Sequence, residues 1–136
     1  MLDIPVFKPL IEEHELRAVR NSLEAGWLGM GKSVGEFEEA TSTFLGLTDR
    51  FAAAVSTGHA ALHLAMLILD FEKDSEIITP ALNNVADFQA IMAAGYKPVF
   101  CDIEEDGLCI DPKSVERLIG PRTKAIVAMD YFCCLA

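Results

Sequence analysis

Apolar residues recur at helical spacing in the first 50 positions of the chain. This spacing predicts one helix over residues 12–25 and a second helix that begins at Ser33 and ends before Gly46. Ser33 and Glu36 match a capping box, in which each side chain bonds the other residue's backbone N–H. Phe37, Ala40 and Phe44 line one face of this second helix.

Beyond residue 50, short apolar runs alternate with helical segments. We expect strands at residues 51–56, 76–79, 98–102 and 124–131. We expect helices at residues 58–69 and 83–94, and a third capped by Asp111 with Pro112 as its first residue. Strands separated by helices are typical of βαβ units. The sequence therefore predicts an α/β fold in which helices flank a mainly parallel sheet, and ligands of such sheets bind at the carboxyl ends of the strands.

Charge and composition narrow the range of partners. The chain has 136 residues, with 11 basic and 21 acidic side chains and a net charge of -10. An acidic surface binds neither a phosphate backbone nor an anionic membrane well, so we expect no nucleic-acid or membrane partner. The most apolar stretch, residues 60–69, is too short to span a bilayer, and no secretion signal is evident. We expect a cytoplasmic protein whose four cysteines are reduced.

The segment GWLGMGKS, residues 26–33, matches the Walker A pattern of nucleotide triphosphatases. That motif functions when a buried strand delivers the glycine-rich turn to a helix. Here the preceding residues, HELRAVRNSLEA, predict a helix, and Trp27, Leu28 and Met30 are bulky for a loop that wraps phosphate. We therefore favour a connection between two helices, with Lys32 in solvent.

A better phosphate site follows the predicted strand at residues 51–56. Gly58 permits a tight turn into the next helix. The backbone N–H groups of His59, Ala60 and Ala61 would then lie at the positive end of the helix dipole, where an anion binds. Many strand-to-helix turns contain a glycine and bind nothing, so the local pattern alone leaves both possibilities open.

Three other groups of reactive residues point to no metal site or nucleophile. His59 and His63 share a helix face, but Ala60 stands where a zinc protease has glutamate, so we favour a partly buried His63 bonded to a neighbour. The carboxylates at residues 102–106 are typical of a solvated loop. Cys133 and Cys134 have no identified base nearby. We therefore predict no metal and no catalytic residue in this chain.

Several separate blocks of the sequence resemble a known family. These blocks are IPVFKPLIEEHELRAVRNSLEAGWL, VGEFEEA, VSTGHAALHLAM, PVFCDI and IDPKSVERLIGPRTKAIV. They are similar to the N-terminal third of the sugar aminotransferases of the DegT/DnrJ/EryC1/StrS group. The resemblance runs through essentially all 136 residues in order.

The resemblance implies a pyridoxal-phosphate enzyme with the aspartate-aminotransferase (type I) fold. Such enzymes move an amino group, usually from glutamate or glutamine, to a keto group of a nucleotide-linked sugar, for polysaccharide or secondary-metabolite synthesis. Two subunits normally build each site, so a homodimer is expected. Residues 1–50 would form an N-terminal helical segment, and residues 51–136 the first part of the large cofactor-binding domain.

The resemblance also implies cofactor-binding residues. Gly58, His59 and Ala60 match the family segment that holds the cofactor phosphate through backbone N–H groups, although His59 replaces a usual Thr or Ser. Asn84 stands where many members place an aromatic ring that stacks on the pyridine. Asp130 stands where many members have a histidine. These departures indicate a divergent subgroup.

The Schiff-base lysine of the family, and the Asp that pairs with the pyridine nitrogen, would lie beyond residue 136. The chain stops at CCLA directly after an apolar run, which also predicts a fragment that is inactive by itself. A strand at residues 51–56 would then lack its usual partners, which favours self-association. Two alternatives remain: a sugar dehydratase (a lyase) of the same fold, and a non-catalytic or regulatory remnant.

Overall fold

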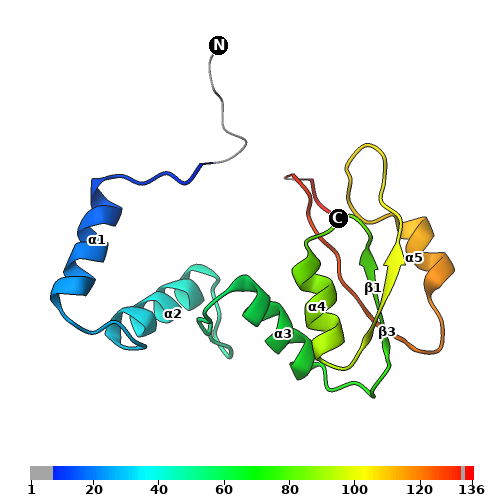
Figure 1. Ribbon diagram of the computed structural model, residues 1–136, viewed down its shortest axis with the longest axis horizontal. Coiled ribbons are helices and arrows are strands. Elements are labelled where there is room, and N and C mark those ends of the chain that lie inside the picture. The colour runs from blue at the N-terminus through cyan, green and yellow to red at the C-terminus, as the bar shows by residue number, and fades with distance from the viewer. Residues whose placement is uncertain (1–7, 133) are drawn as a thin grey trace, which may run out of the picture. The chain divides into compact units, whose positions relative to one another are not determined.

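The computed structural model describes residues 8–132 and 134–136 of the chain (Figure 1). They form two compact units that meet in sequence at Ala54 and Val55. The first unit contains α1 (Glu13–Glu24) and α2 (Lys32–Phe44). The second contains α3 (Gly58–Ile68), β1 (Glu76–Pro80), α4 (Val85–Ala93), β2 (Lys97–Cys101), α5 (Pro112–Leu118) and β3 (Thr123–Ile126). Among the described residues, no helix has the length and apolarity needed to cross a membrane.

The two helices of the first unit lie close to their predicted ranges, but α2 starts differently. Its N-cap is Gly31, and no side chain caps it, so the predicted capping box of Ser33 and Glu36 is wrong. The carbonyl of Gly31 instead accepts the N–H groups of the third and fourth helical residues, both at 3.1 Å. At the other end of the preceding helix, Gly26 adopts a left-handed φ of 71°, as its position after α1 predicts.

The large apolar side chains of α2 are exposed in this unit. Phe37 and Phe44 are 61% and 89% exposed. The partly buried positions are mostly polar and lie on another face of the helix: Val34, Glu38, Thr41 and Ser42. The hydrophobic spacing therefore predicted the helix correctly, while the more buried face of the helix is its polar one.

The second unit is built on a parallel sheet with the order β2-β1-β3. The central strand β1 pairs with β2 in the register Ile77 to Pro98, and with β3 in the register Ile78 to Ile126. Four of its five residues are buried, because a central strand is covered on both faces. This arrangement confirms the predicted α/β fold with a parallel sheet.

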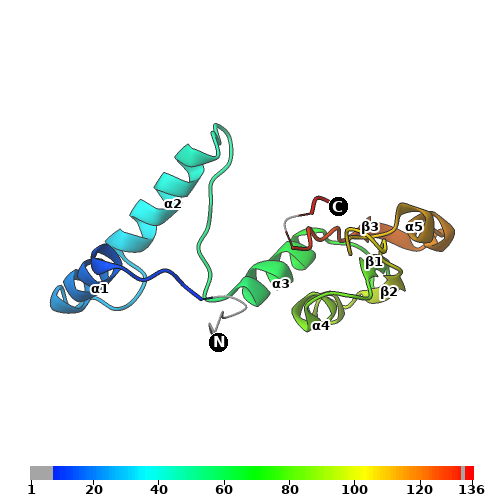
Figure 2. The ribbon, with the colours of Figure 1, turned by 90° about the horizontal axis from the view of Figure 1, so that it is seen from above.

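Helices cover both faces of this sheet (Figure 2). On one face, Ile77 packs with Met66 of α3 and with Ala90 and Ile91 of α4. On the other face, Ile78 packs with Val115 of α5. Adjacent residues of β1 thus point to opposite cores, as the two-residue period of a strand requires.

The predicted start of α5 is confirmed. The Asp111 carboxylate accepts hydrogen bonds from the backbone N–H groups of Lys113 at 2.9 Å and Ser114 at 3.2 Å. Pro112 occupies the first helical turn, where its missing N–H costs nothing.

Two predicted strands differ from the structure. Residues 51–56 form no strand, and none of them makes a backbone-to-backbone hydrogen bond with another described residue. A strand exists only when a neighbouring strand completes its ladder, and the described part of the chain supplies none. The strand expected at 124–131 is limited to Thr123–Ile126, although the N–H of Val127 still donates to the carbonyl of Ile78 at 2.8 Å.

Candidate functional site

The turn that leads into α3 is the predicted phosphate site. Thr57 is its N-cap, with an extended backbone (φ -153°), and its Oγ1 accepts the N–H of Ala60 at 3.1 Å. The Thr57 carbonyl accepts the N–H of Ala61, also at 3.1 Å. The expectation that Ala60 and Ala61 offer free N–H groups is therefore wrong, because both have acceptors within the turn.

Two backbone donors remain at this turn. The N–H groups of Gly58 and His59 are the first two of α3 and have no hydrogen-bond acceptor among the described residues. Both residues are exposed, and a Cβ built on Gly58 would meet no atom within 4 Å. The Thr57 hydroxyl accepts from Ala60 and still has its own proton to donate. The turn thus presents three donors at the positive end of a helix dipole, a combination that suits a phosphate group.

The hydrophobic core of the second unit positions this turn by anchoring the later part of α3. Met66 is buried against Ile77 and Ile91, and Leu62 packs on the same cluster. The first turn of α3 is mostly exposed. The helix is therefore anchored through its second and third turns, while its N-terminus stays accessible to a ligand.

Asn84 lies at the beginning of another helix of this unit. It is the N-cap of α4, and its Oδ1 accepts the N–H of Ala86 at 2.9 Å. Asn83 supports the same loop, because its Nδ2 donates to the buried carboxylate of Asp87. No hydrogen bond joins Asn84 to the Thr57–Ala60 turn in the described residues. The structure thus brings Gly58, His59 and Ala60 together and places Asn84 on a different helix, although α3 and α4 pack against each other.

Two buried polar atoms have no hydrogen-bond partner among the described residues. The Oγ1 atom of Thr79, a fully buried residue near the carboxyl end of β1, has no hydrogen-bond partner in the described residues. The Nε2 atom of His63 is also buried and without a partner there, so the prediction that a neighbour bonds His63 is wrong for this nitrogen. A buried polar group without a partner is costly. The sequence indicated the partial burial of His63, but no pattern of residues identified the buried hydroxyl of Thr79.

The segment that resembles a Walker A motif connects two helices, as predicted. It follows α1 rather than a strand. Trp27 folds over the loop, its Nε1 donating to the carbonyl of Met30 at 2.9 Å. A Cβ on Gly31 would lie 2.5 Å from that Nε1, so the indole occupies the space next to the glycine. Lys32 is exposed and pairs with Glu36 at 3.4 Å, an arrangement that does not wrap a phosphate.

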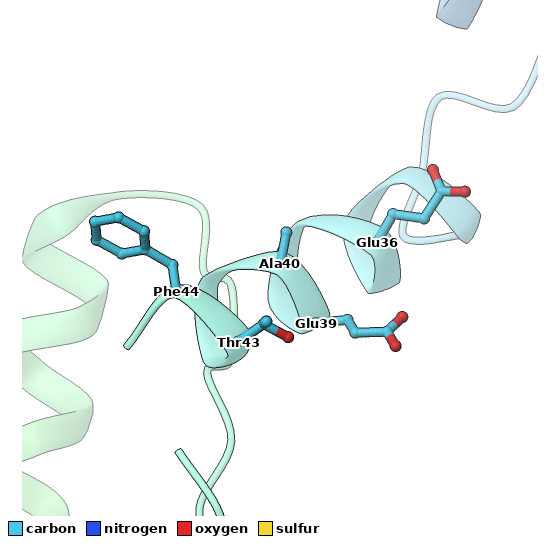
Figure 3. Close-up of a pocket in the computed structure, with 5 residues that line it drawn as sticks. All are labelled: Glu36, Glu39, Ala40, Thr43 and Phe44. Atoms are coloured by element: carbon cyan, nitrogen blue, oxygen red, sulfur yellow. The ribbon is translucent and has the colours of Figure 1, made fainter. Parts of the chain in front are cut away.

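Two hollows lie elsewhere on the surface of the described residues. One, of about 460 Å³, lies on α2 (Figure 3) and is lined by Glu36, Glu39, Ala40, Thr43 and Phe44. The other, of about 640 Å³, follows β2 and is lined mostly by the acidic loop at residues 102–106 and the start of α5. Among residues 8–132 and 134–136, no three His, Cys, Asp or Glu side chains gather as metal ligands.

The cysteines of the second unit differ in their surroundings. Burial raises the pKa of the Cys101 thiol above its usual value of 9.0, and the nearby carboxylates of Asp102 and Asp111 act in the same direction. The Cys109 thiol is buried and donates to the carbonyl of Cys134 at 3.4 Å. Cys134 itself is exposed, and Cys133 lies outside the described residues. A thiol held protonated, such as that of Cys101, is a poor nucleophile.

Comparison with known proteins gives one family for most of the chain. The model of the DegT/DnrJ/EryC1/StrS aminotransferase family matches residues 9–135. That range contains the Thr57–Ala60 turn and Asn84.

Solved structures resemble the chain over nearly its whole length. An E. coli GDP-4-keto-6-deoxy-D-mannose-3-dehydratase with bound hydrated PLP is 27% identical, with a TM-score of 0.83, and the match covers 94% of this chain and 34% of that one. The Helicobacter pylori aminotransferase PseC, involved in pseudaminic acid biosynthesis, is 37% identical, with a TM-score of 0.79 and coverage of 90% and 33%. Bacillus subtilis NtdA with bound PMP is 32% identical, with a TM-score of 0.77 and coverage of 87% and 28%. The chain therefore spans about a third of the length of these proteins.

Proposed function

The chain belongs to the DegT/DnrJ/EryC1/StrS aminotransferase family, and from this premise we propose that the Thr57–Ala60 turn holds the phosphate of pyridoxal 5'-phosphate in a sugar aminotransferase. Enzymes of this family depend on that cofactor, and solved relatives carry it as PLP or PMP. The observation that supports the proposal most directly is the pair of unoccupied N–H groups at Gly58 and His59.

The residues of the turn fit a phosphate group in number and in kind. The N–H groups of Gly58 and His59 and the Thr57 hydroxyl are three donors, and phosphate oxygens accept such bonds strongly. A Cβ built on Gly58 would touch nothing, so the space beside the turn is open to a ligand. The cofactor, once bound, supplies an electron sink for amino transfer. The role of this chain's residues is to hold and orient its phosphate end.

The remaining parts of the enzyme are proposed from the family. Its substrate would be a nucleotide-linked keto sugar, and its amino donor glutamate or glutamine. The Schiff-base lysine would come from sequence beyond residue 136, and two subunits would share the site in a cytoplasmic homodimer. Asn84 would lie against the pyridine ring, where its amide can rest flat on the aromatic face.

A second candidate is a sugar dehydratase of the same fold. The E. coli relative with a TM-score of 0.83 is named as a 3-dehydratase with bound hydrated PLP. Phosphate binding at the Thr57–Ala60 turn would serve both reactions equally. The two candidates are therefore distinguished by residues outside this chain, whereas a non-catalytic remnant would bind no cofactor at this turn.

The phosphate site can be tested with two substitutions at one position. Proline is tolerated at the first residue of a helix and lacks the N–H, while alanine keeps the N–H. The backbone of Thr57, with φ -153° and ψ 158°, is already in the extended region that a following proline requires. Gly58→Pro therefore removes one proposed donor with little change to α3, and Gly58→Ala is the matched control.

The measurement is a titration of the 136-residue chain with pyridoxal phosphate, followed by absorbance, with inorganic phosphate as a competitor. We expect reversible binding with the spectrum of the free aldehyde. The dissociation constant of Gly58→Pro should be about tenfold higher than that of Gly58→Ala, because a hydrogen bond to a charged group is lost. Equal affinity of the proline and alanine variants, or no binding by the unmodified chain, would contradict the proposed site.

A further inference from the structure

The polar face of α2 contacts the segment that was predicted to be the first strand. The Ser42 hydroxyl accepts the N–H of Ala52, and the Glu38 carboxylate accepts the N–H of Ala54, both at 2.8 Å. Both bonds are partly buried. Two side chains of a helix thus bond alternate backbone donors of a segment that has no strand partner among the described residues.

The spacing of Glu38 and Ser42 along the helix matches the spacing of the two backbone donors for a geometric reason. Residues four apart in a helix share a face and are separated by about 6 Å along the axis. Residues two apart in an extended chain point to the same edge and are separated by about 6.6 Å. Glu38 and Ser42 are therefore spaced so that each can reach one of two alternate N–H groups. The order is reversed, since the later helix residue bonds the earlier donor, as expected when the chain folds back after Gly46.

The sequence of this segment explains why such contacts matter. Residues 51–55, FAAAV, are apolar and uncharged, and Phe51 is 83% exposed. An extended apolar segment with open N–H groups on its edge pairs readily with other chains. Natural proteins often protect such an edge by covering it with another element. Here the cover is a pair of side chains rather than a strand.

We infer that the side chains of Glu38 and Ser42 occupy the backbone N–H groups along one edge of residues 51–54. This segment can therefore pair with another strand only along its other edge. The occupied donors are the backbone N–H groups of Ala52 and Ala54. The opposite edge carries the backbone groups of Phe51 and Ala53, which have no backbone partner in the described residues. The inference rests on α2 and this segment alone, and it does not depend on cofactor binding.

Amide hydrogen exchange of the full 136-residue chain, followed by NMR, tests this inference at each backbone amide of the segment. We expect the amides of Ala52 and Ala54 to exchange more slowly than those of Phe51 and Ala53. Ser42→Ala should accelerate exchange about tenfold at Ala52, and Glu38→Ala should do so at Ala54, because each variant removes one acceptor. Glu38→Gln keeps an acceptor oxygen and should preserve the protection.

The matched control is the neighbouring pair Glu39 and Thr43. These residues are also four apart on α2, and Figure 3 shows both on the side that lines the hollow. Glu38→Ala/Ser42→Ala and Glu39→Ala/Thr43→Ala change the net charge equally. Only the first double variant should increase self-association at equal concentration, measured by light scattering. Uniform exchange across residues 51–54, or equal self-association of the two double variants, would overturn the inference.

Discussion

The Oγ1 atom of Thr57 accepts the N–H of Ala60 at 3.1 Å, and this bond decides which donors of α3 remain for a ligand. A helix leaves its first N–H groups without partners, and the N-cap side chain normally satisfies one of them. Here the cap takes the third helical N–H and leaves the first two, those of Gly58 and His59. Thr57 therefore fixes both the start of the helix and the position of the proposed phosphate site.

Removal of this cap should destabilise the second unit. Thr57→Ala is expected to lower its free energy of unfolding by about 1 kcal/mol, because the N–H of Ala60 loses its acceptor. Thr57→Ser keeps the hydroxyl and should behave as the unmodified chain does. Urea unfolding followed by circular dichroism measures the difference. Identical unfolding midpoints for the alanine and serine variants would show that the bond does not contribute.

The cap of α5 should be at least as important, because Asp111 satisfies two N–H groups rather than one. Asp111→Ala should cost about 1–2 kcal/mol of stability. Asp111→Asn retains one acceptor oxygen and should recover part of the loss. The same urea experiment provides the comparison, and a harmless alanine substitution would mean that buried Val115, rather than the cap, fixes this helix.

Local patterns predicted most of the second unit correctly. The buried run at Ile77 and Ile78 and the cap at Asp111 each identify their element without information from elsewhere in the chain. Thr57 could also have been identified, since a threonine directly before a helix is a common N-cap. The helix-forming pattern and the capping chemistry act over a few residues, so a single sequence contains them.

The error at the predicted first strand involves partners that are distant in the sequence. The residues at 51–56 have the composition of a buried strand, but strand formation requires a neighbour, and the bonds of Ala52 and Ala54 go to helix α2 instead. Phe37 and Phe44 lie on the helix face that their spacing indicated, and both side chains are exposed. Hydrophobic spacing shows that a helix has an apolar face, but it does not show what that face contacts.

Thiol chemistry should separate the cysteines of the second unit. Cys134 is exposed and should react with iodoacetamide in the native protein, whereas Cys101 is 2% exposed and should be protected. The raised pKa of Cys101 adds to this protection, because the thiolate is the reactive form. Mass spectrometry of the alkylated peptides measures both. If Cys101 were alkylated as fast as Cys134 under native conditions, the buried position of Cys101 at the end of β2 would be contradicted.

The same pKa shift has a consequence for stability in alkaline solution. Because the folded state raises the pKa of Cys101 above 9.0, the unfolded chain loses this proton first as the pH rises. Its contribution to stability is therefore complete below pH 9 and declines above it. Cys101→Ala should show a weaker decline than the unmodified chain in urea unfolding between pH 8 and pH 10.5. An identical decline in both proteins would assign the alkaline sensitivity to other groups.

Asn84 allows helix stability and cofactor affinity to be separated. Its Oδ1 caps α4 by accepting the N–H of Ala86, so Asn84→Trp should cost about 1 kcal/mol of stability. The indole would nevertheless offer a flat aromatic surface at the position proposed to lie against the pyridine ring. Such a contact is worth roughly two- to tenfold in affinity. The tryptophan variant should therefore be less stable than the unmodified chain and yet bind pyridoxal phosphate more tightly.

The control for this prediction is Asn84→Ser, which retains a capping oxygen without adding an aromatic ring. It should keep the stability of the unmodified chain, and its affinity should be no higher than that of the unmodified chain, because the amide proposed to lie on the ring is removed. Binding is measured by the same absorbance titration, and stability by urea unfolding of each variant. If the tryptophan and serine variants bind pyridoxal phosphate equally, residue 84 does not face the ring, and its contribution is limited to capping α4. An affinity that rises while stability falls cannot be explained by the cap, because loss of the cap acts only on the helix.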